Sequence, residues 1–240
     1  MVPGMNIRIL TLFPDFLRQY FETSIMGRAV AAGKIAVTVT DIRDFSTDRH
    51  RTVDDAPYGG GAGMVLMPEP LGQAIESVRT PESHCVYPTP SGRIFRQSDA
   101  RRLSEYEDLI LICGRYEGID QRIIDEYVDE ELSIGDYVLS SGELAAMVIV
   151  DAVFRLKDGI IRPESLVEES FQDGLLEYPH YTRPEVYHGN PVPDVLISGH
   201  HRKITEWRNK KRIEKTMRNR PDLLPTDGSV QDERSENGRH

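Results

Sequence analysis

Two short runs of the chain combine glycines, a tyrosine and carboxylates in a pattern that suits a binding pocket. The first is Cys113–Asp120 (CGRYEGID) and the second is Ser133–Glu143 (SIGDYVLSSGE). Each follows or contains an apolar, strand-like stretch, and glycines let the backbone after a strand turn sharply and approach a ligand closely. Sites of α/β proteins are built in this way. The sequence therefore predicts that two loops converge on one pocket.

Other kinds of catalytic site do not fit the sequence. The histidines lack the spacing of metal ligands, and no serine lies in a nucleophile elbow. The glycine run Gly59–Gly63 lacks the lysine and hydroxyl residue of a phosphate-binding loop, which leaves a mobile, substrate-facing loop or a structural turn. The remaining chemistry is positioning and proton transfer by a few carboxylates and arginines, with no metal site.

Length and composition bound the class of protein. The 240 residues suffice for one large or two modest domains. We find neither an apolar stretch of roughly 20 residues, as a membrane helix needs, nor a secretory signal pattern. Cys85 and Cys113 lie in apolar surroundings and are predicted to be buried, reduced thiols. We expect a cytoplasmic protein without membrane contact.

Charge is distributed unevenly along the chain. The formal net charge is −10, but His200–Pro221 holds nine lysines and arginines against two glutamates, a local charge of +7. The local field, rather than the net charge, governs binding to phosphates. This segment is therefore either a nucleic-acid-binding surface or a solvated helix face.

Strand and helix patterns alternate along the first two thirds of the sequence. This alternation predicts an α/β fold with a mostly parallel sheet. After Leu156, frequent prolines and glycines interrupt the pattern until a basic helix at about 201–219. Strands are expected at 6–13, 35–40, 83–88 and 108–113, helical patterning at 15–32, helices at 68–78, 97–105, 119–127 and 142–156, and extended chain at 128–140.

Long motifs in fixed order resemble a known family. The chain is similar to the bacterial tRNA (guanine-N1-)-methyltransferases that modify guanosine 37, beside the anticodon. The resemblance covers roughly residues 5–224. It rests on Leu12–Pro14, Asp48–Asp55, Pro57–Gly61, Cys113–Asp120, Ser133–Ser140, Gly174–Leu176, Pro179–Pro184 and Ser198–His200.

The resemblance implies a SPOUT fold, in which the parallel sheet carries a C-terminal trefoil knot. It divides the chain into a knotted catalytic domain (1–161), a linker (162–174), a small, mainly helical tRNA-binding domain (175–224) and a disordered tail (225–240). S-adenosylmethionine is implied as the methyl donor, bound in the knot by three loops. The matching residues are Tyr87, Pro88, Thr89, Pro90, Gly114, Tyr116, Glu117, Gly118, Ser133, Ile134, Gly135, Asp136, Tyr137, Val138, Leu139, Ser141, Gly142 and Ala145.

The catalytic residues implied by the resemblance are Glu169 and Arg155. Methyl transfer to guanine N1 requires removal of the N1 proton, which pushes negative charge toward O6. The family has an aspartate base immediately before a Ser-Phe pair, and here that position holds Glu169. Asp173 is the alternative base, and Arg155 could instead stabilise the end of its helix.

The resemblance also implies partners. These are the anticodon stem-loop of tRNA and a second copy of the chain, in a homodimer whose active site is composite. Magnesium dependence is a family trait for which the sequence offers no dedicated site. Two alternatives remain: a tRNA-binding factor without catalysis, and a methyltransferase of the same fold that acts on another RNA.

Overall fold

The first part of the chain forms a five-stranded sheet in which every strand pairing is parallel. The structure, a computed structural model, describes residues 4–162 and 169–224 and divides the chain into two compact units, Met1–Ile161 and Arg162–His240. The strand order is β2-β1-β6-β5-β7. Its strands are β1 (Asn6–Thr11), β2 (Ala36–Asp41), β5 (Ser83–Ile94), β6 (Asp108–Ile112) and β7 (Glu130–Ser133).

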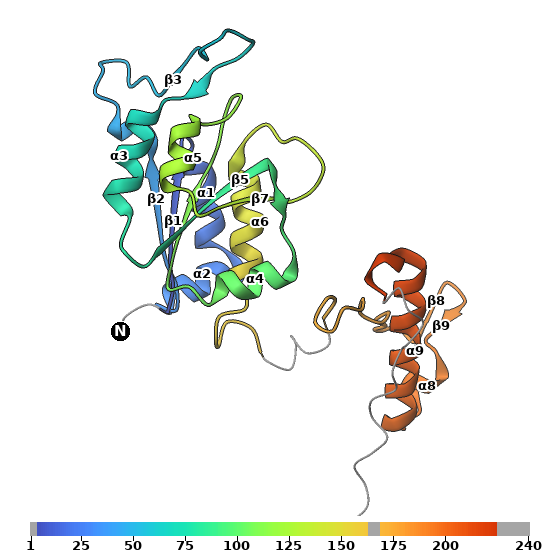
Figure 1. The fold of residues 1–240 in the computed structure, drawn as a ribbon. Coiled ribbons are helices and arrows are strands. Elements are labelled where there is room, and N and C mark those ends of the chain that lie inside the picture. Colours follow the sequence, from blue (N-terminus) through green and yellow to red (C-terminus); the bar gives the residue numbers. More distant parts are fainter. Residues whose placement is uncertain (1–3, 163–168, 225–240) are drawn as a thin grey trace, which may run out of the picture. The chain divides into compact units, whose positions relative to one another are not determined.

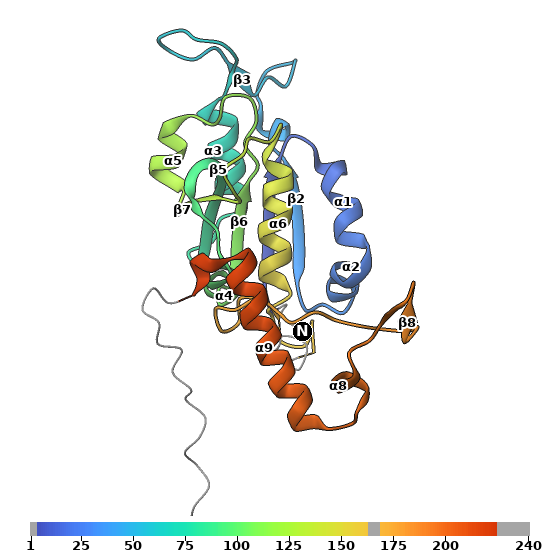
Figure 2. The same ribbon diagram turned by 90° about the vertical axis from the view of Figure 1, so that its right-hand side faces the viewer.

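Helices cover both faces of this sheet, as Figures 1 and 2 show from two sides. One face packs against α1 (Pro14–Glu22), α2 (Ser24–Ala31), α4 (Gln97–Ser104) and α6 (Gly142–Phe154). The other packs against α3 (Pro68–Val78) and α5 (Gln121–Tyr127).

The core follows from the two-residue period of a strand. In β6 and the residue after it, Leu109, Leu111 and Cys113 face the first helical layer, whereas Ile110 and Ile112 face the second. All are wholly or almost wholly buried. A strand covered on both faces is expected to be apolar throughout, which is how this segment reads in the sequence. The predicted α/β fold with a mostly parallel sheet is confirmed.

Several boundaries differ from the sequence prediction: the strand expected at 6–13 ends at Thr11, the helix expected at 142–156 ends at Phe154, and of the extended chain expected at 128–140 only Glu130–Ser133 is a strand. Two further differences have a clear physical cause. The helical patterning at 15–32 is two helices, because the chain bends at Thr23, which is extended, and Ser24, which has φ of 57°. The predicted strand 83–88 continues to Ile94 across a register shift between Pro88 and Arg93. Prolines cannot donate to a ladder, so the strand bulges away and then pairs with β7 again.

Both cysteines are buried and unbonded, as predicted. Burial raises the pKa of the Cys85 thiol to about 12, and it raises the pKa of Cys113 as well, with the Glu143 carboxylate adding to the effect. Neither thiol is suited to act as a nucleophile, because the reactive form is the thiolate.

Shorter elements complete the first unit. They are the 3₁₀ helix η1 (Ile42–Phe45) and the antiparallel pair β3 (Asp54–Asp55) and β4 (Val65–Leu66). Glu130 of β7 is the centre of an ionic cluster: it accepts hydrogen bonds from His84 on β5, Arg93 on β5 and Arg102 on α4. This cluster joins the two limbs of the bulged strand to its neighbours.

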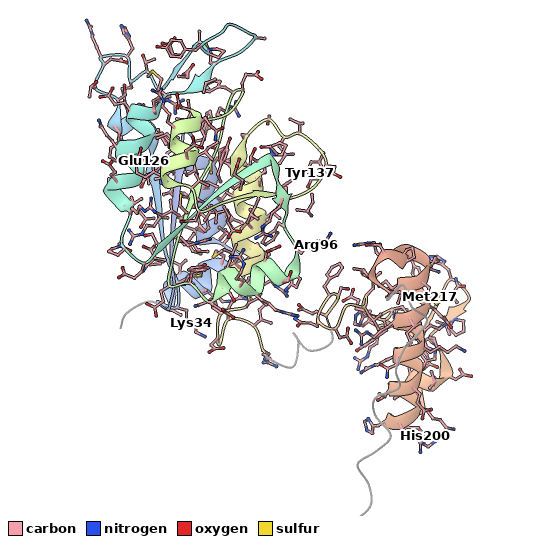
Figure 3. All side chains as sticks on the ribbon, viewed as in Figure 1. Lys34, Arg96, Glu126, Tyr137, His200 and Met217 are labelled. Atoms are coloured by element: carbon pink, nitrogen blue, oxygen red, sulfur yellow. The ribbon has the colours of Figure 1, made fainter. Side chains whose placement is uncertain are left out.

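The second unit is small and mainly helical. Its long helix α9 (His201–Asn219) matches the predicted basic helix, and His200 and Met217 mark its opposite ends in Figure 3. The unit also contains β8 (Val186–Tyr187), β9 (Asn190–Pro191), α8 (Asp194–Ile197) and the 3₁₀ helix η2 (Pro221–Leu223). The predicted tail, 225–240, and residues 163–168 of the predicted linker lie outside the described residues. Within the described parts of both units, no helix has the length and apolarity needed to span a membrane.

Candidate active site

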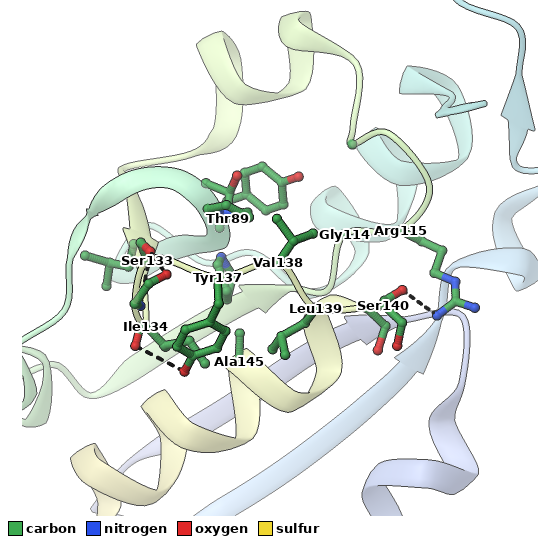
Figure 4. Close-up of a pocket in the computed structure, with 18 of the residues that line it drawn as sticks. Thr89, Gly114, Arg115, Ser133, Ile134, Tyr137, Val138, Leu139, Ser140 and Ala145 are labelled. Carbon is green, nitrogen blue, oxygen red and sulfur yellow. Dashed lines mark hydrogen bonds between the residues drawn. The ribbon is translucent and has the colours of Figure 1, made fainter. Parts of the chain in front are cut away.

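One cavity of about 240 Å³ lies where β6 and β7 end, beside the bulge of β5. Figure 4 shows how side chains from three loops surround it. Of the eighteen residues predicted to bind the cofactor, all except Asp136 line this cavity. The expectation that the two glycine-tyrosine-carboxylate runs converge on one pocket is therefore confirmed, and the loop at Tyr87–Pro90 joins them.

The cavity depends on close contact between two main-chain segments. The amide of Gly142 donates to the carbonyl of Gly114 at 2.9 Å. A Cβ at Gly142 would stand 2.6 Å from the Gly114 nitrogen, closer than non-bonded atoms can approach. Ser141, the residue before Gly142, has φ of −163°, which is extended backbone that any residue adopts. The serine therefore fits this position.

The loop that begins at Ser133 is stabilised by hydrogen bonds within itself. The amide of Gly135 donates to Ser133 Oγ at 3.2 Å, and Tyr137 Oη donates to the Ile134 carbonyl at 3.3 Å (Figure 4). Gly135 has φ of 148°, and a Cβ there would stand 2.5 Å from the ring of Tyr137. Glycine is thus required by both the backbone conformation and the packing of the tyrosine.

The loop Gly114–Gly118 is held by hydrogen bonds to residues that do not line the cavity. The amide of Glu117 donates to the carbonyl of Met64, and the amide of Leu66 donates to Gly118, both at 3.0 Å. A Cβ on Gly63 would meet the side chain of Glu117 at 2.5 Å. The glycine run predicted as a mobile or turning segment therefore ends against a loop of the cavity.

Two tyrosines and one arginine give the cavity its polar character. Burial raises the pKa of Tyr87, and burial together with the nearby Asp54 carboxylate raises the pKa of Tyr116, so both hydroxyls remain neutral donors. Arg115 Nη1 donates to the Ser140 carbonyl at 2.9 Å (Figure 4). This hydrogen bond links the loop Gly114–Gly118 to the loop that begins at Ser133.

The sequence prediction missed three lining residues: Arg115, Leu132 and Ser140. Arg115 and Ser140 lie within the two runs, which already contained the signal, and Leu132 directly precedes the second run. Asp136, in contrast, lies in the predicted run but does not line the cavity. Within residues 4–162 and 169–224, no three His, Cys, Asp or Glu side chains are grouped to hold a metal ion.

The two predicted catalytic residues belong to different units. Arg155 is the half-buried C-cap residue of α6, in the first unit. Glu169 is the first described residue after the gap, in the second unit, and is half-buried there. Asp173, the alternative base, forms an ion pair with Arg212. The hydrogen bond from Arg212, with a smaller contribution from its positive charge, lowers the pKa of Asp173, which makes this carboxylate a weaker base.

The structure is that of a ligand-binding α/β protein. A parallel sheet lies between two helical layers, and loops at the carboxyl ends of its strands form a cavity. The chain belongs to the TrmD family of tRNA (guanine-1)-methyltransferases, whose sequence model matches residues 5–226. The resemblance drawn from the motifs is therefore confirmed.

Similar proteins come from several bacteria. A protein of Treponema denticola is 59% identical over 220 residues, which is 92% of this chain and 90% of that protein. A protein of Treponema pallidum is 60% identical over 220 residues (92% and 88%), and one of Chloroflexus aggregans is 57% identical over 223 residues (92% and 88%). All three are named tRNA (guanine-N(1)-)-methyltransferase.

Proposed function

We propose that this protein transfers a methyl group from S-adenosylmethionine to N1 of guanosine 37 in tRNAs that carry G at position 36. The observation that supports this most is the convergence of seventeen predicted donor-binding residues on one cavity. Family membership supplies the class of reaction. An enzyme with this substrate would act in the cytoplasm.

The cavity suits the proposed methyl donor. An adenine edge is recognised by hydrogen bonds, and the glycine-rich loops expose backbone N–H and C=O groups where side chains would block them. A Cβ at Gly114 or Gly135 would clash with a tyrosine ring, and a Cβ at Gly142 would clash with the backbone of Gly114, so these loops need glycine to keep their course around the cavity. We assign the adenosine of the donor to the loop at Ser133–Leu139. The rest of the donor molecule is assigned to the loops Tyr87–Pro90 and Gly114–Gly118. When bound, the donor would supply an electrophilic methyl carbon on a sulfonium.

The residues of the chain would supply the proton chemistry. The guanine N1 lone pair becomes nucleophilic only when the N1 proton leaves, so we assign Glu169 as the general base that takes it. Arg155 would stabilise the negative charge that develops on O6. A glutamate at the position of the family's aspartate has the same functional group on a chain that is longer by one methylene. A magnesium requirement stays a prediction, with no site assigned.

The knotted topology is part of the proposal. Two close main-chain approaches support it: Gly142 against Gly114, and Gly92, where a Cβ would stand 2.5 Å from the backbone of Glu131 and Leu132. Segments that thread past one another need such glycines, because side chains would keep the backbones apart. A knot would also hold the three loops in a fixed relation before the donor binds.

A homodimer with a composite site is also proposed. Leu144 and Val148 lie one turn apart on α6, and Phe16 lies on α1; all three are 40–51% exposed. Tyr20 Oη donates to Asp151 at 2.5 Å and joins these two helices, so the apolar side chains share one surface. Exposed apolar patches of this kind mark interfaces. A second copy that covers this patch would complete the proposed composite site.

The tRNA would be bound by the basic helix. On α9, Arg202, Lys203, Lys210 and Arg218 are exposed, which suits contact with phosphates of the anticodon stem-loop. His180, Tyr181 and Arg183 lie between two prolines and form a second candidate RNA-binding surface in the same unit.

The direct test is a methylation assay with radiolabelled S-adenosylmethionine and tRNA transcripts that carry G or A at positions 36 and 37. We expect label transfer only to the transcript with G at both positions. Binding of the donor with no transfer to any transcript would instead favour a tRNA-binding factor without catalysis. Transfer to other RNAs would indicate a different substrate.

A further inference from the structure

The residues that follow Glu169 form a closed loop. The amide of Phe171 donates to the Leu175 carbonyl at 2.9 Å, and the amide of Glu177 donates to Ser170 Oγ at 3.1 Å. Phe171 and Gly174 have φ of 71° and 83°, which lets the chain reverse twice within a few residues. We call residues 169–177 the catalytic loop. Glu169 lies at its start, so the position of the loop determines the position of this carboxylate.

The catalytic loop is fastened to α9 at two positions. Arg212 forms an ion pair with Asp173, and its Nε donates to the Leu176 carbonyl at 3.3 Å. The amide of Leu176 donates to Thr216 Oγ1 at 3.0 Å, and Thr216 is wholly buried. Residues 212 and 216 are four positions apart and lie on the same face of the helix. This face therefore holds the loop through three separate contacts.

Arg212 differs from the other basic residues of α9. Its side chain is 14% exposed, compared with 92% for Arg202 and 74% for Lys210. Its charge is already paired with a carboxylate, and the guanidinium faces the catalytic loop rather than solvent. Such a residue is poorly placed to contact a phosphate. The basic helix thus has an exposed set of cations, whereas Arg212 is committed to structure.

The geometry points to a positioning role for the Asp173–Arg212 pair: it ties the catalytic loop to α9, so that the helix that binds tRNA also fixes the position of Glu169. This inference rests on the proposed function for the roles of Glu169 and α9. Substrate held on α9 and a base held by the same helix move as one body, which lowers the entropy lost in aligning the base with its proton.

The test is a double-mutant cycle in the full-length protein, with Asp173→Asn, Arg212→Gln and the two combined. Single-turnover methylation of the G36-G37 transcript is expected to slow about tenfold in each single variant and no further in the double, because the two side chains act as one unit. Arg212→Lys should restore part of the rate. Equal affinity for S-adenosylmethionine in all variants would place the effect outside the donor cavity.

The salt dependence of tRNA affinity separates positioning from phosphate contact. Losing one phosphate contact lowers the slope of log affinity against log salt by about 1. We expect Arg212→Gln to keep the wild-type slope. A reduced slope at an unchanged rate would make Arg212 a tRNA contact and overturn the inference.

Glu206→Gln is the matched control. It removes the exposed Arg202–Glu206 pair from the same helix without touching the catalytic loop. We expect its single-turnover rate to equal that of the wild type. A slowing equal to that of Arg212→Gln would show that loss of any ion pair on α9 suffices, and the specific role of Asp173–Arg212 would be abandoned.

Amide hydrogen exchange tests the inference without relying on activity. The amides of Phe171, Leu176 and Glu177 are hydrogen-bonded within the catalytic loop or to α9. Arg212→Gln should speed their exchange at least tenfold, while the amides of β6 stay protected. Unchanged exchange would overturn the inference even in an active enzyme. A wild-type protein that transfers no methyl group would instead refute the proposed function, with the exchange result still deciding the role of the pair.

Discussion

Gly142 and Gly114 touch through their backbones alone. The Gly142 amide donates to the Gly114 carbonyl at 2.9 Å, and a Cβ on Gly142 would come within 2.6 Å of the Gly114 nitrogen. One residue begins α6, and the other follows β6. The cavity therefore depends on a main-chain contact between segments that are distant in the sequence.

Gly142→Ala should damage the cavity more than its small size suggests. The added methyl group meets backbone atoms, which cannot rotate away, so we expect a loss of roughly 1–3 kcal/mol in the free energy of unfolding. Affinity for S-adenosylmethionine should fall at least tenfold. Urea denaturation and isothermal titration calorimetry measure the two effects.

Gly72→Ala is the control for this change. Gly72 lies within α3, and its Cβ would meet only side chains at ordinary contact distances, those of Ile123 at 3.4 Å and Tyr127 at 3.9 Å. Alanine favours a helix over glycine by roughly 0.5–1 kcal/mol, so stability should hold or rise. If Gly142→Ala behaves like Gly72→Ala, the backbone contact does not govern the cavity.

Glu169→Gln tests the general base. The amide keeps the shape of the side chain but cannot accept the N1 proton, so the rate should fall about 10²–10⁴-fold. Affinity for S-adenosylmethionine should stay at the wild-type value, because the residues assigned to the donor all belong to the first unit and are unchanged in this variant. Rapid-quench methylation measures the chemical step. A nearly unchanged rate would move the base to another residue, with Asp173 as the first to examine.

Local patterns were enough to predict the sheet and the cavity. In β6, five consecutive buried residues read as a strand covered on both faces, and α9 has the bounds that its basic pattern indicated. The glycine runs predicted loops because glycine adopts backbone conformations, such as the φ of 148° at Gly135, that other residues avoid.

Features that depend on contacts between residues distant in the sequence could not be predicted. The return of β5 from Pro88 to Ile94 is stabilised by pairing with β7, which follows it by dozens of residues. The Asp173–Arg212 pair joins a loop and a helix whose spacing carries no periodic signal. Asp136 stood within a predicted run, yet only the actual course of the backbone excludes it from the cavity.

Glu130 should make stability depend on pH in the acid range. Burial alone would raise its pKa, but hydrogen bonds from His84, Arg102 and Arg93 outweigh burial and lower the pKa from 4.5 to about 2. The unfolded chain therefore binds this proton more readily, and the stabilisation present above pH 4.5 is lost as the pH falls toward about 2. After solvent screening it should amount to roughly 1–2 kcal/mol.

Glu130→Gln isolates this contribution. The variant should be less stable than the wild type at pH 7, and the two should converge near pH 2, as followed by urea denaturation across the pH range. Asp15→Asn, which breaks the exposed pair with Arg18, should leave the pH profile unchanged. Parallel profiles for Glu130→Gln and the wild type would show that the ionic cluster does not control acid stability.

The exposed apolar patch on α6 and α1 predicts that the protein is a dimer. Leu144 and Val148 are 40% and 48% exposed, and burying a carboxylate between apolar surfaces is strongly unfavourable. Leu144→Glu combined with Val148→Glu should therefore yield a folded monomer in light scattering with size-exclusion chromatography, and methyl transfer should be lost with the composite site. Ile197→Glu changes an equally exposed apolar residue on α8 and should stay dimeric. Should the double variant remain a dimer, the interface must lie on another face of the protein.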